Sequence, residues 1–115
     1  MEDRILVSTK QILGLDANDD PFDLEIITFI NSALSTLEQL GLTVTYIEDS
    51  AATWSDLNIN PEVLAMVRAY ILLKTRMAFD PPVTSFHIEA ASKQIQEFEW
   101  RISTYREVGD PWIAP

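Results

Sequence analysis

The chain has 115 residues, the usual size of one domain. Its 8 Lys and Arg residues against 18 Asp and Glu residues give a formal charge of −10, which argues against a stand-alone nucleic-acid binder with a basic surface patch. Hydrophobic residues make up 47% of the chain, too many for a disordered protein, and the lack of cysteine excludes disulfides, thiolate zinc sites and cysteine nucleophiles.

The sequence predicts a soluble protein of the cytosol or of a virion. No apolar run approaches the roughly 18 residues needed to cross a bilayer. Residues 1–4 lack the basic start and apolar stretch of a signal peptide. The negative charge is concentrated in residues 1–57, which hold 11 acids and 2 bases. One interpretation is a solubilising surface, and the other is an acidic face with a specific function.

Apolar residues at helical spacing predict two helices in the first third of the chain. The first covers residues 3–13 and ends at Gly14. The second begins with Asp20 as its N-cap and Pro21 in its first turn, and it ends at Gly41. Its apolar stripe is widened, so we expect it to bury two sides; the residues that widen it are Leu24, Ile27 and Leu34.

Residues 42–60 form an irregular excursion after the second helix. The β-branched segment 43–47 is too short to found a sheet, so it is either an extended loop or an edge segment. A single helical turn is expected at residues 54–57.

Two further helices are predicted in the second half. Asn60-Pro61 opens the third, and Asp80-Pro81-Pro82 stops it. Thr84 or Ser85 caps the fourth and longest helix, which Gly109 closes. Its apolar positions form a heptad seam suited to packing along another helix, namely Ile88, Ala91, Ile95, Phe98, Ile102 and Tyr105.

The predicted fold class is therefore all-α, a four-helix domain with an irregular excursion between helices 2 and 3. We expect the helical domain to cover residues 1–109. Residues 110–115 are expected to form an extended C-terminal tail.

No constellation of catalytic or metal-binding residues is present in the sequence. Asp16, Asn18 and Asp20 imitate the start of a calcium loop, but Pro21 replaces the required glycine and Ile27 the required bidentate glutamate. His87 is the single histidine, and we expect it to be a surface or capping residue. We predict no enzyme activity, no metal and no cofactor.

Trp100 lies about 200° around the fourth helix from the seam residue Phe98, on a polar face. It is either a contact at the edge of the domain or an interface anchor. Trp112 and Ile113 raise the same question, because a short tail has little of its own domain to pack on. We expect them to dock on a neighbouring subunit or partner.

Four segments together resemble a family of tailed-bacteriophage head–tail connector (adaptor) proteins. They are residues 9–15 (TKQILGL), 20–27 (DPFDLEII), 79–82 (FDPP) and 94–101 (QIQEFEWR). Each segment alone is a helix cap or a core stripe, but their order and spacing are specific. The resemblance covers most of the chain, apart from Gly41 to Asn60, where no partner contact carries over.

The resemblance implies an all-helical subunit of a phage or prophage that forms a ring, usually twelvefold, below the portal protein in the neck of the virion. Such rings extend the DNA channel and dock head–tail stopper or tail completion proteins, and their members are often described as DNA packaging proteins. It implies residence in the host cytoplasm before assembly and no membrane. The alternative is a small soluble helical adaptor or regulator that acts as a monomer or dimer.

The charge pattern agrees with a ring that DNA crosses without specific binding, because an acidic lumen would repel phosphates. The candidates for this acidic channel or contact surface are Asp16, Asp19, Asp20, Asp23, Glu48 and Asp49. A ring contact uses two different patches of each subunit. The candidate interface residues are Arg76, Lys93, Trp100, Arg101 and Trp112, with Trp100 as the apolar anchor.

Overall fold

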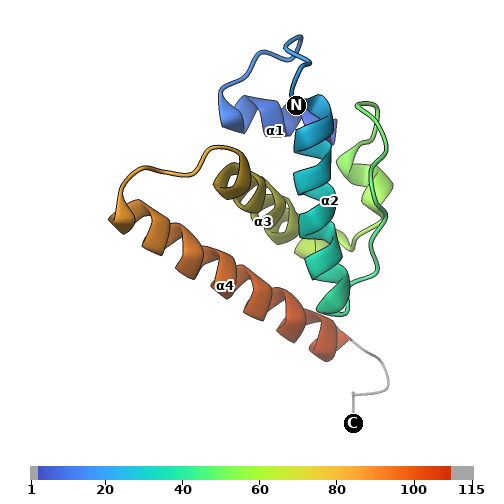
Figure 1. Ribbon diagram of the computed structural model, residues 1–115. Helices are drawn as coiled ribbons and strands as arrows, with labels where there is room; N and C mark the ends of the chain where they lie inside the picture. Colours follow the sequence, from blue (N-terminus) through green and yellow to red (C-terminus); the bar gives the residue numbers. More distant parts are fainter. Residues whose placement is uncertain (1–2, 110–115) are drawn as a thin grey trace.

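The computed structural model describes residues 3–109, which fold into four α-helices and contain no strand. These are α1 (Ile5–Leu13), α2 (Asp23–Gln39), α3 (Pro61–Phe79) and α4 (Ser85–Gly109), with a short 3-10 helix, η1 (Trp54–Leu57), between α2 and α3 (Figure 1). The all-α fold class with its irregular excursion is confirmed. The expected tail at residues 110–115 lies outside the described residues.

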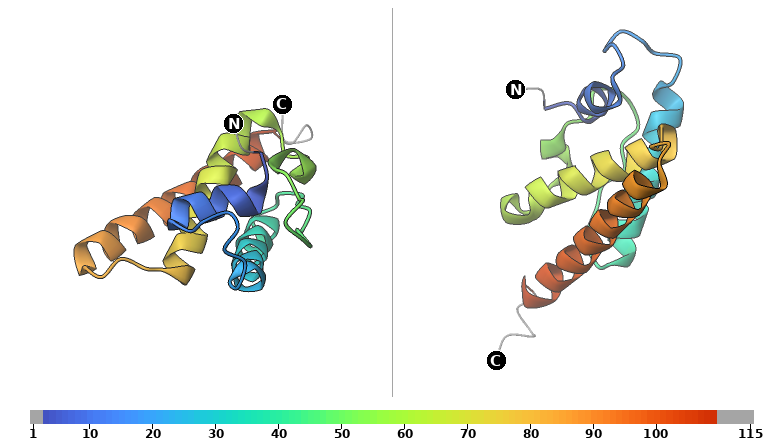
Figure 2. Two further views of the ribbon diagram at one scale, coloured as in Figure 1. Left: turned by 90° about the horizontal axis from the view of Figure 1, so that it is seen from above. Right: turned by 90° about the vertical axis from the view of Figure 1, so that its left-hand side faces the viewer.

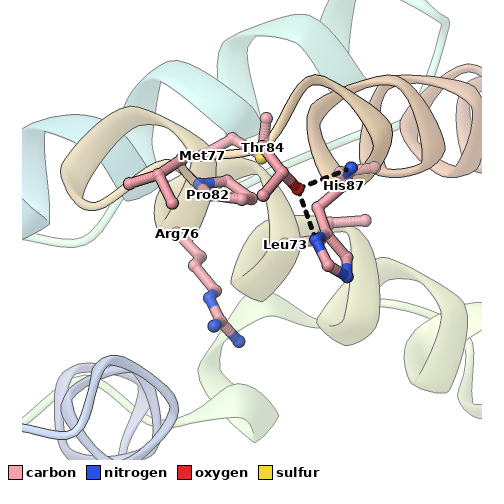
Figure 3. A pocket seen from close by; sticks show the side chains of 8 residues that line it. Leu73, Arg76, Met77, Pro82, Thr84 and His87 are labelled. Atoms are coloured by element: carbon pink, nitrogen blue, oxygen red, sulfur yellow. Dashed lines mark hydrogen bonds between the residues drawn. The ribbon is translucent and has the colours of Figure 1, made fainter.

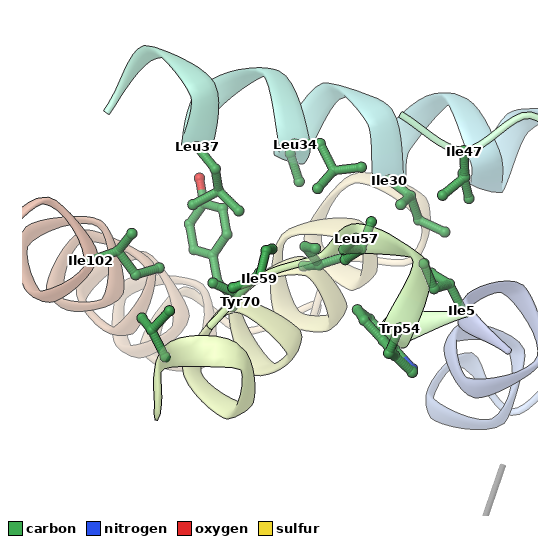
Figure 4. Packing of buried hydrophobic residues seen from close by; sticks show 14 of the residues in the cluster. Ile5, Ile30, Leu34, Leu37, Ile47, Trp54, Leu57, Ile59, Tyr70 and Ile102 are labelled. Atoms are coloured by element: carbon green, nitrogen blue, oxygen red, sulfur yellow. The ribbon is translucent and has the colours of Figure 1, made fainter. Parts of the chain in front are cut away.

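Helices α2 and α3 cross at the centre of the molecule, α1 lies across one end and contacts both, and α4 packs against α3 (Figures 1 and 2). The core between them is built from aliphatic side chains and two large aromatic ones. Figure 4 shows this cluster, in which Trp54 fills the space near α1 and Tyr70 the space between α2 and α4. Both aromatic side chains are almost completely buried.

The same Asx-Pro signal leads to different structures at α3 and α2. At α3 the prediction is confirmed, because Pro61 is the first helical residue and the Asn60 side chain accepts a hydrogen bond from the backbone N–H of Glu62 at 2.9 Å. The predicted N-cap role of Asp20 is wrong. The Asp20 carbonyl instead accepts from the backbone N–H of Asp23 at 3.2 Å, so residues 20–23 form a turn with Pro21 at its favoured second position. Helix α2 begins only after that turn.

Helix α2 buries one broad side, made of Ile26, Ile30 and Leu34 among others. The prediction for Leu24 is wrong, because its side chain is 79% exposed. Leu24 lies about 200° around the helix from Ile26, which places it away from the side that α1 and α3 cover. Gly41 follows the end of α2 with a positive φ of 104°, as a helix-terminating glycine does.

The segment 43–47 is an extended loop that a side chain of α2 holds in place. The Asn31 amide donates to the Ile47 carbonyl and its oxygen accepts from the Ile47 N–H, both at 2.9 Å. Asn31 thus replaces the neighbouring strand that this segment lacks, and Ile47 is buried in the core. The predicted helical turn at 54–57 is confirmed as η1, which has a capping box between Thr53 and Asp56.

The apolar seam of α4 faces α3, but it reaches the core only from Ile95 onward. Ile102 is completely buried, whereas Ile88 is 39% exposed and residues 85–90 are all exposed. Tight packing along the whole seam is therefore not observed. Among the described residues, the first two turns of α4 have only the end of α3 and the connecting loop beside them (Figures 1 and 2).

Replacing Thr75 with valine should raise the free energy of unfolding by about 1 kcal/mol. The side chain is completely buried on α3, and its hydroxyl has no hydrogen-bond partner among residues 3–109. Valine has the same shape and removes the unsatisfied group. The matched control is Thr9→Val, because the equally buried Thr9 hydroxyl donates to the Ile5 carbonyl at 2.8 Å. Urea unfolding should show a higher free energy of unfolding for Thr75→Val and a lower one for Thr9→Val. A lower free energy of unfolding for both variants would contradict the unsatisfied state of the Thr75 hydroxyl.

Candidate interaction surfaces

The outer face of α4 carries three of the residues predicted to form an interface. Lys93, Trp100 and Arg101 are all exposed and lie seven and eight residues apart, so they share one helix face. The Trp100 side chain is 67% exposed, which confirms that it points away from the seam. Arg101 binds Glu97 on the same face at 2.7 Å. We call these four residues, Lys93, Glu97, Trp100 and Arg101, the outer α4 face.

On the opposite side of α4, a polar cluster of Tyr70, Lys74 and Glu99 joins this helix to α3. The buried Tyr70 hydroxyl donates to Oε2 of Glu99 at 2.7 Å, and Lys74 Nζ lies 3.6 Å from the same oxygen. Burial raises the pKa of the Tyr70 hydroxyl well above its usual value, and the hydrogen bond to Glu99 and its negative charge raise it further. Tyr70 therefore stays protonated as a donor, and α4 is held at a fixed rotation that presents its outer face to solvent.

Arg76 lies apart from the outer α4 face, in a groove where α3 ends and α4 begins. This α3–α4 groove has a volume of about 510 Å³ and is lined by Leu73, Arg76, Met77, Pro82, Val83, Thr84, His87 and Ala91. Figure 3 shows its lining, in which the Thr84 hydroxyl accepts from the backbone N–H of His87 at 3.3 Å and contacts the His87 Nδ1 at 2.6 Å. Thr84 thus caps α4, as one of the two predicted capping residues, and His87 is an exposed surface residue, as expected.

The predicted acidic residues occupy two loops at the end of the molecule where α2 begins. Asp16, Asp19 and Asp20 lie in the α1–α2 loop, and Glu48 and Asp49 lie in the segment between α2 and η1. The two loops stand on different sides of α2 (Figures 1 and 2). Four of these five residues are exposed, and Asp19 is half-buried.

Asp23 has an internal role, unlike the other predicted acids. Its Oδ1 lies 2.5 Å from Nζ of Lys10, whose side chain is only 2% exposed. The Lys10 ammonium also donates to the Ala17 carbonyl at 3.2 Å. Because a buried ammonium needs a partner, this pair joins α1, the following loop and the first turn of α2. Asp23 therefore contributes little charge to an outward-facing surface.

The chain matches the phage connector protein family over residues 5–109, which includes all four helices. It is a member of that family. No curated protein and no solved structure matches the chain significantly. As a phage connector protein it has a structural role as a component of the virion, where it contacts other proteins of the phage head or tail.

Three contacts in this connector involve residues of the segments that carry the family resemblance, and two of them join one such segment to another. Lys10 belongs to the segment 9–15, and Asp23 belongs to the segment 20–27. Phe22 of the second segment packs edge-to-face on Phe79 of the third, with ring centroids 5.4 Å apart. Glu99 of the fourth segment accepts the Tyr70 hydrogen bond. These segments therefore contribute contacts that hold the helices together.

Between residues 3 and 109 there is no group of three or more His, Cys, Asp or Glu side chains that could hold a metal ion. In the same range no helix is both long and apolar enough to span a bilayer.

Sequence reasoning missed two features of the connector surface. The α3–α4 groove depends on how two helices diverge after Phe79, and helical spacing within one element carries no signal for it. Val83 and Phe86, which are 97% and 74% exposed, lie outside the apolar seam. The one sequence signal for this exposure was the position of both residues just after Pro81-Pro82. A proline pair ends α3 and separates it from α4, so the first turn of α4 is left uncovered. Trp112 lies outside the described residues.

Proposed function

We propose that this connector is an adaptor subunit that forms a ring below the portal, extends the DNA channel and docks the stopper or tail completion protein. Membership of the phage connector family carries this proposal. The exposed outer α4 face supports it, because a large indole that is 67% exposed and flanked by two cations is typical of an interface anchor. We infer that neighbouring subunits, or the portal, cover this face.

A closed ring requires two different surfaces on each subunit, since its contacts are head-to-tail. The outer α4 face carries Lys93 and Arg101, whereas the loops beside the start of α2 carry only acidic charges. Opposite charges on separate faces favour such a contact. Arg101 already binds Glu97, so Lys93 is the cation of that face with no acidic partner among the described residues.

DNA would cross the ring without being bound. No basic residue lies between Lys10 and Arg68, and Lys10 is buried against Asp23. Arg68 is half-buried and its guanidinium lies over the Trp54 ring, 5.2 Å from the ring centroid. The exposed acids Asp16, Asp20, Glu48 and Asp49 are our candidates for the channel wall, where their charge would repel the duplex over about 8 Å at physiological salt.

Replacing Trp100 with alanine should weaken assembly at least tenfold. Truncation of an aromatic anchor in an interface typically costs about 2 kcal/mol or more of binding free energy. The readout is mass photometry of the purified connector at several concentrations, alone and with the portal protein. Arg101→Glu should also weaken assembly, because it reverses a positive charge on the outer α4 face. Gln11→Ala is the control, since Gln11 is also exposed but lies on α1, apart from the outer α4 face.

Rings, or growth towards rings with concentration, would support the adaptor function. A strict monomer or dimer that ignores the portal protein would favour the alternative, a small helical regulator. If both the Trp100 and Arg101 variants assembled normally, the ring would still be supported, but the outer α4 face would not be part of its subunit contacts.

A further inference from the structure

We propose that the α3–α4 groove receives residues 110–115 of the adjacent copy of this chain, so that each copy binds the next through its tail. This inference rests on the proposed ring. No segment between residues 3 and 109 fills the groove, and the groove would be the binding site of Trp112 from the adjacent copy.

The groove combines an apolar floor with positive charge at its rim. Leu73, Met77 and Ala91 supply apolar surface, and its volume of about 510 Å³ lies within the roughly 300–1,000 Å³ range of pockets that bind small ligands. Arg76 is exposed, and no acidic group pairs with it between residues 3 and 109. The side chains of Arg76 and His87 extend to the same side of the groove (Figure 3).

The segment 110–115 has the complementary chemistry. Its sequence is DPWIAP, one acidic residue followed by an apolar run that contains the indole of Trp112. The two prolines restrict its backbone, which lowers the entropy lost when a short segment is ordered on a surface. Asp110 at the rim beside Arg76, with Trp112 on the apolar floor, would satisfy both parts of the groove.

The tail cannot reach the groove of its own chain. Trp112 follows Gly109 by three residues, which span at most about 11 Å. Ala91 is the groove residue on α4 nearest to Gly109, and it precedes Gly109 by 18 positions, which correspond to about 27 Å along the helix. His87 is farther still. The occupant must therefore come from a second copy, which makes the contact head-to-tail as a ring requires.

Crosslinking through single engineered cysteines tests the contact directly, because the natural chain has no cysteine. The full-length A91C variant is mixed with a full-length I113C variant of different tag size, and a short bis-maleimide is added. We expect the mixed dimer in several-fold higher yield than from N18C with I113C, since Asn18 is exposed in the α1–α2 loop. Equal yields from the two pairs would overturn the proposal.

A charge swap tests the rim. Arg76→Glu should lower the A91C–I113C yield about tenfold at concentrations below saturation, and adding Asp110→Arg in the partner should restore it. Arg76 is exposed, and unchanged circular dichroism would show that the variant is folded. Failure of the swap to restore the yield would count against the assignment.

The same variants separate this inference from the proposed function. Rings on the portal protein without the A91C–I113C crosslink would overturn the tail contact and leave the adaptor function intact. The crosslink in a protein that never joins the portal would support the tail contact and overturn the adaptor function. A crosslink from I113C to the portal in place of A91C would assign the tail to a different partner and overturn the proposal.

Discussion

Replacing Trp54 with alanine is expected to lower the free energy of unfolding by about 4 kcal/mol, the largest effect of any single truncation considered. The indole is 2% exposed and lies where η1 meets two helices. Its Nε1 donates to the Ser8 hydroxyl of α1 at 3.2 Å, and the Arg68 guanidinium of α3 covers its ring. Truncation leaves a cavity and removes the element that joins the excursion to the core.

The chain provides a matched control in a second tryptophan. Trp100→Ala removes the same side chain from an exposed position and should change the unfolding free energy by less than about 1 kcal/mol. Urea unfolding of both variants, followed by far-ultraviolet circular dichroism, makes the comparison. Similar losses of stability in the two variants would contradict the placement of Trp54 in the core.

Replacing Asp23 with alanine is expected to cost about 2–3 kcal/mol of unfolding free energy. The change leaves the buried Lys10 ammonium with the Ala17 carbonyl as its remaining partner. Breaking a fully buried pair costs about 3–5 kcal/mol. The value here is lower because Asp23 is 27% exposed, so water partly screens the pair.

Removing the other partner should be milder. Lys10→Met eliminates the buried charge, fills most of the volume and leaves Asp23 partly hydrated at the N-terminus of α2, where negative charge is favourable. We expect a cost below about 1 kcal/mol. Glu25→Ala, an exposed carboxylate in the same helical turn, is the control and should have a similarly small effect. Equal losses for Asp23→Ala and Lys10→Met in urea unfolding would contradict the asymmetry.

The sequence predicted the helices because their signals are local, and it failed where a distant contact decides. Asn60-Pro61 began α3 as predicted, since the cap needs only the next two residues. The equivalent signal at Asp20-Pro21 led to a turn, after which Asp23 meets Lys10 of the preceding helix. Burial of Lys10 was not predictable from periodicity, because it depends on a carboxylate thirteen residues further along the chain.

The candidate surfaces show the same division. Helical spacing alone was enough to place Trp100 on a polar face of the fourth helix, and in the structure Lys93 and Arg101 are exposed on the same face. Their role in an interface stays a prediction. Arg76, another of the interface candidates, lies in the α3–α4 groove, and its position there depends on the angle between two helices. The uncovered start of α4 has the same cause. The apolar seam continues along the whole helix, but the elements that could bury it do not extend along the first turns.

Cryo-electron microscopy of the phage neck would show directly whether this chain forms a ring there. We expect this polypeptide to form a closed ring between the portal and the tail, with its outer α4 faces covered and acidic side chains along the channel. Absence of the chain from the neck, or a channel wall lined with its arginine and lysine side chains, would contradict it.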